Sequence, residues 1–322
     1  MRASFIVSRD QADRRLDRVL RGLYERVPLA AIMRAVRKGE VRVDGRRAAA
    51  DYRLCEGEVV ATPWTEADRR SPVRAGTASP ENHEKLAVLF RSPDLLCVDK
   101  PAGLLSQPDR RGGDSLITRV WRALSRERDD FRPATISRLD RNVSGVVAVA
   151  LNAATLRLLS AMMRERSIGK TYAAVVLGNP PDEGEIDLPL LKDEAKNLVR
   201  VALAGQCGLP SLTRYRTLER YRDGALVELE LVTGRPHQAR VHLSAIGHPI
   251  LGDAKYGKCG QRGQKGERGN GGVRDKNARL FLHARTLFFP NSADLPNALR
   301  GTIIESPLPK EFTDLSSIGM FV

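Results

Sequence analysis

The first sixty residues carry two helical patterns followed by short alternating strands. Between Asp10 and Val27, leucines at positions 16, 20 and 23 recur at helical spacing with arginines between them, which predicts a basic amphipathic helix. A second helix is predicted from Pro28 to Lys38, ending at Gly39, since glycine suits a left-handed C-cap. The stretch "EVRVDGRRA" then alternates around an Asp-Gly turn, and "CEGEVVATP" supplies another strand. These patterns predict a small α-α-β module.

Beyond this module the periodicity stops and then resumes. Residues 63–84 are polar and proline-rich without any period, which predicts a linker. The stretch "KLAVLFRSPDLLCVDKPAGLL" predicts a hairpin followed by a sharp loop. Helices are predicted from Ser115 to Arg126 and from Ala153 to Ser167. We therefore expect a small domain over residues 1–62, a linker over 63–84 and a larger domain over 85–322.

The pattern of the larger domain predicts its fold class. A strand, "GKTYAAVVLGNP", lies between Gly169 and Gly178, and "ALVELELVTGRPHQARVHLSAIGHP" predicts a strand, a turn and a helix opening at Pro236. Strands come in antiparallel-looking pairs, and neither a dinucleotide-binding nor a Walker-type glycine loop is present. We expect an α+β fold, with a mixed, mainly antiparallel sheet flanked by helices.

A surplus of basic residues narrows the choice of partners. The chain has 53 Lys+Arg against 39 Asp+Glu, a formal charge of +14, which attracts phosphate backbones or anionic lipid. Residues 258–277 combine six glycines and six Lys/Arg with two acids, and both a surface insertion and an RNA-contacting arm fit this loop. No apolar run of 18 or more residues and no apolar signal segment occurs, so we expect a cytoplasmic protein.

The cysteines point away from metal and disulfide chemistry. Cys55, Cys97, Cys207 and Cys259 are far apart and form no C-x-x-C pair. Neither a zinc site nor a disulfide framework is indicated, and we expect reduced thiols.

Three groups of polar residues could carry chemistry. Asp140 stands between two arginines in "SRLDRNVSG", and Tyr172 follows Lys170 in a predicted strand. The third group surrounds the turn before the last predicted helix and comprises Arg235, His237, Gln238, Arg240 and His242. Taken singly, an aspartate flanked by arginines is commonly a surface ion pair, and a strand tyrosine is commonly a core residue. Helical spacing puts His237, Arg240 and Ser244 on one face, and such a helix N-terminus suits a phosphate or carboxylate.

Together and in order, the three groups resemble the motifs of one family. "SRLDRNVSG" resembles H-R-L-D-x-x-T-S-G, "KTYAAVVLG" resembles K-x-Y-x-A-x-V-x-G, and "LVTGRPHQARVHLSAIGHPILGDAKYG" resembles L-x-T-G-R-x-H-Q-I-R-x-H with its Gly-His-Pro tail. These are signatures of the RluA-type pseudouridine synthases, and the resemblance covers roughly residues 8 to 312. The N-terminal module resembles the S4 RNA-binding domain. The whole chain is most similar to the RluC-type enzymes, which modify uridines of large-subunit ribosomal RNA.

The resemblance implies a role for each candidate residue. Asp140 becomes the catalytic aspartate, Tyr172 the tyrosine packed over the target base, and Arg240 the arginine paired with Asp140. Arg138 would help to extrude and replace the base, which must leave its stack to reach the site. The resemblance of the N-terminal module to the S4 domain implies that Arg34, Arg37 and Lys38 face phosphates. We also expect Arg235, His237 and Gln238 to bind RNA, because they stand at the start of the last predicted helix. No metal or organic cofactor is implied, and we expect a monomer that acts on RNA without an obligate protein partner.

Departures from the family pattern and alternative functions follow from the same residues. Ser137 replaces the usual His, Val143 the usual Thr and Ala239 the usual Ile, and none of these changes removes a proposed catalytic group. One alternative is a noncatalytic RNA-binding or ribosome-assembly protein on the same fold, and another is a synthase acting on tRNA. A glycosidase would need a second carboxylate near Asp140, for which Asp253 or Glu230 could approach in space.

Overall fold

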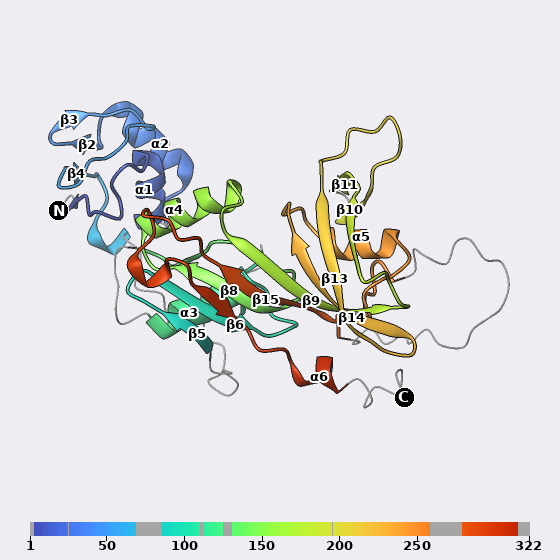
Figure 1. Ribbon diagram of the computed structural model, residues 1–322. Coiled ribbons are helices and arrows are strands. Elements are labelled where there is room, and N and C mark those ends of the chain that lie inside the picture. Colours follow the sequence, from blue (N-terminus) through green and yellow to red (C-terminus); the bar gives the residue numbers. More distant parts are fainter. Residues whose placement is uncertain are drawn as a thin grey trace. The chain divides into compact units, whose positions relative to one another are not determined.

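The computed structural model describes residues 3–24, 26–68, 86–109, 113–124, 131–194, 196–257 and 279–314 (Figure 1). The chain divides into two compact units. The first comprises Met1–Lys85, Ile117–Ala134 and Ala150–Arg157, and the second comprises Leu86–Leu116, Thr135–Val149 and Leu158–Val322. The predicted basic loop over 258–277 and most of the predicted linker over 63–84 lie outside the described residues.

The N-terminal part of the first unit contains two helices and a four-stranded sheet. Its elements are β1 (Ser4–Ile6), α1 (Leu16–Leu23), α2 (Leu29–Lys38), β2 (Arg42–Val43), β3 (Arg46–Arg47) and β4 (Val59–Ala61), with sheet order β1-β4-β2-β3. The left-handed C-cap at Gly39 is confirmed, with φ of 72°. The Asp-Gly turn is confirmed too, since Asp44 and Gly45 have φ of 47° and 74°. The turns that connect the elements of this module are therefore determined by local residue types, Gly39 and Asp44-Gly45.

Two details of this module differ from the prediction. The first helix begins at Leu16 instead of Asp10, and the residues before it form turns, with Asp13 at a φ of 59° that a helix does not allow. Strand β1 was not predicted, because its residue types do not follow its alternating burial: Ile6 is apolar but exposed, next to the buried Phe5. The observed order is β-α-α-β-β-β, and β1 pairs with the closing strand β4.

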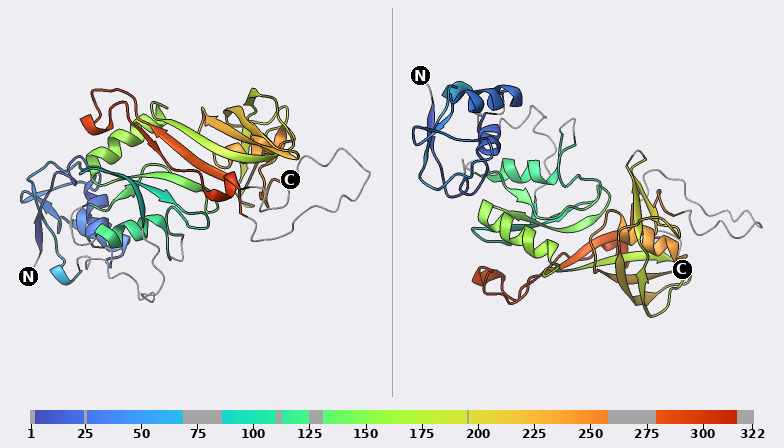
Figure 2. Two further views of the ribbon diagram at one scale, coloured as in Figure 1. Left: turned by 60° about the horizontal axis from the view of Figure 1, so that its bottom comes forward. Right: turned by 90° about the horizontal axis from the view of Figure 1, so that it is seen from above.

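A ten-stranded sheet organises the larger part of the chain (Figures 1 and 2). Its order is β10-β13-β14-β9-β15-β8-β6-β5, with β16 beside β15 and β7 beside β8. The strands are β5 (Ala87–Arg91), β6 (Leu95–Lys100), β7 (Ala134–Thr135), β8 (Ser144–Ala150), β9 (Gly169–Leu177), β10 (Glu183–Asp187), β13 (Leu212–Arg220), β14 (Gly224–Leu231), β15 (Leu282–Phe288) and β16 (Ile303–Glu305). Strand β15 is parallel to β8 and antiparallel to β9, so the predicted mixed, mainly antiparallel sheet is confirmed.

Helices and a small hairpin complete the described chain. They are α3 (Leu116–Leu124), α4 (Ala153–Arg164), α5 (Gln238–Ala245), α6 (Lys310–Thr313) and the hairpin of β11 (Leu190–Asp193) with β12 (Leu198–Val201). Helix α5 packs against β12, β13 and β14, and residues 238–244 are all buried. This helix begins at Gln238 instead of Pro236, because His237 takes a left-handed backbone with φ of 54°. His237 therefore does not share the helical face predicted for it with Arg240 and Ser244.

The Ser-Gly dipeptide after Asp140 marks a close approach of two strands. All seven residues of β8 are buried, and Gly145 has φ of 117°. A Cβ atom at Gly145 would lie 2.1 Å from the carbonyl oxygen of Ala284 on β15. Only glycine fits this contact. The start of β8, just beyond Asp140, is therefore fixed against the centre of the sheet.

Candidate active site

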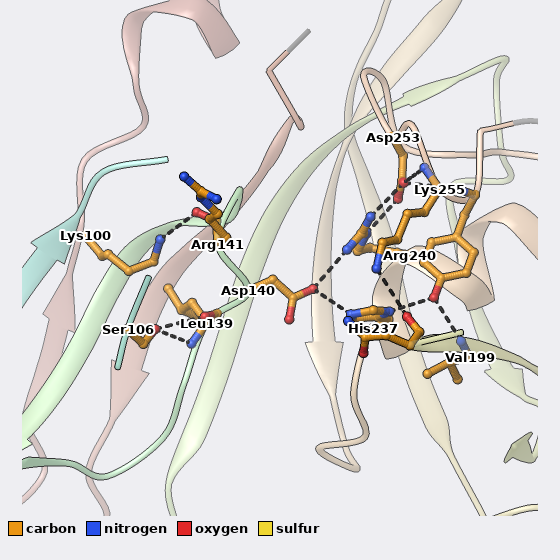
Figure 3. A network of polar contacts seen from close by, with 12 residues as sticks. Lys100, Ser106, Leu139, Asp140, Arg141, Val199, His237, Arg240, Asp253 and Lys255 are labelled. Carbon is orange, nitrogen blue, oxygen red and sulfur yellow. Dashed lines mark hydrogen bonds and ion pairs between the residues drawn. The ribbon is translucent and has the colours of Figure 1, made fainter. Parts of the chain in front are cut away.

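The loop that carries Asp140 is held on both sides of the carboxylate (Figure 3). It connects β7 to β8. Ser106 Oγ accepts a hydrogen bond from the Leu139 N–H at 3.0 Å and donates one to the Leu139 carbonyl at 2.9 Å. On the other side, the Gly103 N–H donates to the Arg141 carbonyl at 2.8 Å, and the Arg141 guanidinium donates back to the Gly103 carbonyl at 2.9 Å. Asp140 thus projects from a fixed turn.

Lys100 anchors the same turn from inside the protein. Its side chain is fully buried, and its ammonium group donates to the carbonyls of Pro101, Leu104 and Arg141 at 3.0, 2.8 and 3.1 Å. Burial lowers the pKa of Lys100 to about 8, although the nearby Asp140 carboxylate opposes this shift. The end of β6 is therefore tied directly to the Asp140 loop.

Arg240 reaches Asp140 from helix α5. Its Nη1 donates to Oδ2 of Asp140 at 3.0 Å across a separation of 100 residues, while Nε and Nη2 donate to the two oxygens of Asp253, each at 2.8 Å. Burial alone would lower the pKa of Arg240, but the hydrogen bonds and charges of Asp253 and Asp140 outweigh it and raise the pKa. The guanidinium is a charged bridge between two carboxylates.

The second carboxylate, Asp253, is closed to substrate. Its side chain is 0% exposed, against 34% for Asp140. Its Oδ1 also accepts the backbone N–H groups of Lys255 and Tyr256 at 2.9 and 3.1 Å. A carboxylate with both oxygens occupied can hold Arg240 but cannot serve as an acid or base toward a substrate. The glycosidase alternative therefore does not fit, and Glu230 lies instead beside Arg214, 3.8 Å away, on the surface.

His237 is the third group at Asp140. Its Nε2 lies 3.6 Å from Oδ2 of Asp140, and its Nδ1 lies 2.6 Å from the hydroxyl of Tyr256. Burial, the largest effect, lowers the pKa of His237, and Arg240 acts in the same direction while Asp140 opposes both. The imidazole is therefore mainly neutral at pH 7.

Arg240 and His237 both contact the same oxygen of Asp140. Within the described part of the chain, the other oxygen, Oδ1, has no hydrogen-bond partner. One carboxylate oxygen is thus held by the protein, and the second is left for a reacting group.

Tyr172 lies on β9 in register with Leu229 on β14 and Ala284 on β15. Burial raises the pKa of Tyr172 to about 12, and the negative charge of Asp140 adds to this shift. The phenol therefore stays neutral around pH 7. Lys170 shares this strand face, two residues earlier, and burial lowers its pKa to about 8.

Two classes of feature are lacking in the parts of the chain that the structure describes. None of the described helices is long and apolar enough to span a bilayer. No set of three or more His, Cys, Asp or Glu side chains in these ranges could hold a metal ion.

Comparison with known proteins decides the family. A family model described as RNA pseudouridylate synthase matches residues 94–245. The ribosomal large subunit pseudouridine synthase C of Yersinia pestis is 36% identical over 309 residues, covering 95% of this chain and 92% of the relative. The chain belongs to this family. The protein of the same name from Vibrio cholerae serotype O1 is 35% identical over 292 residues, covering 89% of this chain and 88% of the relative.

The fold agrees with a solved member of the family. The structure of human RNA Pseudouridylate Synthase Domain Containing 4 superposes with a TM-score of 0.55 at 28% identity, covering 70% of this chain and 90% of that one. The predicted family and fold class are thus confirmed, and the chain is an RNA pseudouridine synthase, an isomerase of uridine in RNA.

Within this synthase, the remaining site predictions have different outcomes. Arg138 is exposed, and its guanidinium has no hydrogen bond or ion pair among the described residues. Arg235 is partly exposed and donates to the Pro210 carbonyl. Gln238 corrects the prediction: it is 1% exposed, and its amide bonds to Thr233, Thr213 and backbone groups, so it holds the turn and is closed to RNA.

Sequence reasoning did not assign several residues that build the synthase site. Lys100, Ser106 and Tyr256 were not singled out, and Asp253 was considered only as a second acid. Lys100 stands in "DKPAG", Ser106 in "LLSQP" and Tyr256 in "GDAKYG". The only signals in the sequence were a lysine next to a turn, at Lys100, and two polar residues between glycines, Asp253 and Tyr256. They did not indicate which backbone groups these side chains would meet.

Proposed function

We propose that this synthase isomerises uridines of large-subunit ribosomal RNA, with Asp140 as its catalytic residue. Relatives named for that RNA match 89 to 95% of the chain. The observation that carries the role of Asp140 is its geometry, with Oδ2 bonded to Arg240 at 3.0 Å and Oδ1 left open. A carboxylate paired with a permanent cation and partly exposed is suited to react with a sugar carbon or proton.

The proposed reaction moves one glycosidic bond and one proton. The bond between C1′ and N1 breaks, the uracil turns, and C5 joins C1′. The C5 proton then leaves and N1 takes up a proton, so that atoms and charge balance. The Asp140 carboxylate either attacks C1′ or removes a ribose proton, and both routes use the oxygen Oδ1 that the protein leaves open. The fixed turn around Asp140 keeps the carboxylate still while the base rotates.

Two residues are proposed to handle the base. Tyr172 offers a neutral ring on which the freed uracil stacks, so that it turns without escaping. Arg138, exposed two residues before Asp140, is placed to enter the RNA and fill the position of the extruded base. We propose that Arg240 stays with Asp140 and Asp253 throughout, because each of its three nitrogens already donates a hydrogen bond to one of these carboxylates.

Residues 1–62 are proposed to bind RNA as an S4-like module. Arg34, Arg37 and Lys38 are all exposed on α2. Arg47 of the following hairpin packs over Gly39 and donates to the Lys38 carbonyl at 3.2 Å, which brings a further cation to the end of this helix. Such a basic cluster suits phosphate groups, and contacts to phosphates set the affinity for RNA without distinguishing its base sequence.

We propose that the synthase works as a monomer.

Mapping of pseudouridines tests the substrate. Ribosomal RNA and tRNA from cells with and without the gene are treated with carbodiimide and read by primer extension. We expect stops at one or a few large-subunit sites to disappear without the gene and to return when it is restored. If only tRNA stops change, the substrate is tRNA. If no stop changes in either RNA, the noncatalytic alternative is favoured.

A further inference from the structure

Tyr256 contacts both groups that hold Asp140. The guanidinium carbon of Arg240 lies 5.1 Å from the centre of the Tyr256 ring, and the hydroxyl lies 2.6 Å from Nδ1 of His237. The backbone of Tyr256 is fixed as well, since its N–H donates to Asp253 at 3.1 Å and its carbonyl accepts from Ser244 Oγ at 2.7 Å. A buried tyrosine in this position can control the arrangement of its two neighbours.

The hydrogen bonds of Tyr256 determine which nitrogen of His237 carries the proton. The hydroxyl oxygen accepts the Val199 N–H at 3.0 Å, so its own proton is available to Nδ1 of His237. A neutral His237 then carries its proton on Nε2, the nitrogen that faces Asp140. The opposite tautomer would turn a nitrogen lone pair toward the carboxylate. It would also leave the Tyr256 proton without an acceptor among the described residues.

We propose that His237 and Tyr256 are positioning residues. Arg240 is hydrogen-bonded to Oδ2 of Asp140, His237 points Nε2 at the same oxygen from 3.6 Å, and Tyr256 orients His237, so that Oδ1 is directed to the ribose. Neutral His237 with its proton on Nε2 is the working form. This inference rests on the proposed catalytic role of Asp140. It replaces the predicted RNA contact of His237 with a contact inside the protein.

Protonation of His237 is expected to disable the arrangement. Among the residues that the structure describes, the charged and titratable groups facing its ring are Asp140, Asp253, Arg240, Lys255 and Tyr256. A second proton would sit on Nδ1 and displace the proton that Tyr256 donates there. An imidazolium beside Asp140 would also withdraw negative charge from the reacting carboxylate. Turnover should therefore fall as pH drops through the pKa of His237, which lies below its ordinary value of 6.5.

Two variants test the pair, and a third controls for stability. His237→Asn suits the left-handed backbone, which asparagine tolerates, but its shorter side chain cannot reach Asp140. Tyr256→Phe removes only the hydroxyl. Tyr24→Phe is the matched control, because the buried Tyr24 hydroxyl is bonded to Thr62 Oγ1 at 2.9 Å in the core of the N-terminal module. Each is assayed on ribosomal RNA fragments for kcat, for RNA dissociation constant and for the pH dependence of kcat.

We expect His237→Asn to lower kcat by about 100-fold, the scale of a misplaced reacting group, with an unchanged dissociation constant and no acid limb from His237. Tyr256→Phe should lower kcat by about tenfold, the factor corresponding to one neutral hydrogen bond. Its acid limb should move to higher pH, because the bond donated by Tyr256 exists only with neutral His237. Tyr24→Phe should leave both kcat and the pH profile unchanged.

Other results would overturn the inference. A raised dissociation constant with normal kcat in His237→Asn would mean that the imidazole binds RNA. Normal kcat and an unmoved acid limb in Tyr256→Phe would remove the role of the hydroxyl. Asp140→Asn, assayed in parallel, separates the two proposals. If it retains turnover, the proposed role of Asp140 fails, whereas an inactive Asp140→Asn beside a normal His237→Asn rejects only the positioning pair.

Discussion

At the scale of single residues, one guanidinium joins two carboxylates that serve different purposes. Arg240 gives two of its hydrogen bonds to the enclosed Asp253 and one to the partly exposed Asp140. Asp253 neutralises and orients Arg240 inside the protein. The remaining nitrogen of Arg240, Nη1, donates to Asp140. Both residues are aspartates, so it is burial that distinguishes the structural carboxylate from the proposed catalytic one.

This difference predicts that the same substitution lowers stability far more at Asp253 than at Asp140. Asp253→Asn places an amide against the guanidinium of Arg240 and leaves a buried cation without its main partner. The free energy of unfolding should therefore fall by about 3 kcal/mol. Asp140→Asn removes one partly exposed bond and should change the free energy of unfolding by less than about 1 kcal/mol. Urea unfolding of both variants measures this. Equal losses in the two would contradict the division of roles.

Contacts between single residues were harder to predict from the sequence than the residues themselves. The pairing of Asp140 with Arg240 was implied by family resemblance, because no local pattern connects residues 100 positions apart. Gln238 was assigned to RNA because of its polar neighbours in sequence. Its actual partners, Thr213 on β13 and Thr233 in the turn, come together only in the folded chain. Residue types are visible in sequence, but the atoms they face are not.

At the scale of elements, the positioning of Asp140 depends on where β8 begins. Close contact between Gly145 and Ala284 fixes this strand against β15, and Lys100 at the end of β6 fixes the loop before it. Helices α2, α3 and α4 and strand β9 were predicted within a few residues, because their patterns extend over several turns or strand positions, whereas β13 and β15 were not assigned from the sequence. Strand β1 was missed and α1 was placed too early, because short segments and a left-handed Asp13 interrupt the pattern.

Substitution of Gly145 tests this dependence. In Gly145→Ala the new methyl would lie 2.1 Å from a backbone oxygen, so β8 and β15 must separate, and the free energy of unfolding should fall by roughly 3 kcal/mol or more. Gly103→Ala is the matched control: its φ is 87°, but among the described residues no atom beyond its chain neighbours lies within 4 Å of the new methyl, and backbone strain alone should lower stability by roughly 1 kcal/mol. Thermal unfolding compares the two. A similar decrease in Tm for both would show that the close contact is unimportant.

At the scale of the whole molecule, some basic residues are candidates for RNA contact, whereas others are paired with acids on the surface. The chain carries a net charge of +14, but many of its arginines are paired with acids, as Arg214, Arg216 and Arg220 are with Glu185, Glu228 and Asp182. The exposed cations of α2 are the stronger candidates for phosphate contact, because within the described ranges only Lys38 among them has an acid near it, Glu40 at 3.9 Å.

A charge-matched pair of triple variants tests this view. Replacing Arg34, Arg37 and Lys38 by Gln should weaken RNA binding and reduce the slope of log K against log salt by about 2, the value for three phosphates of a single strand. Replacing Arg214, Arg216 and Arg220 by Gln removes the same charge from paired positions and should change the slope much less. Equal changes in both proteins would mean that only net charge matters and that α2 makes no specific contact.

The central claim is that one carboxylate performs the reaction, and Asp140→Asn tests it most directly. Asparagine is nearly isosteric, so the fold and the basic surface that supplies most RNA affinity should persist. Tritium released from C5-labelled uridine in ribosomal RNA fragments measures turnover, and filter binding measures affinity on the same fragments. We predict normal binding and a loss of turnover of several orders of magnitude, as when a nucleophile or base is removed from other enzymes. Near-normal tritium release would contradict the account.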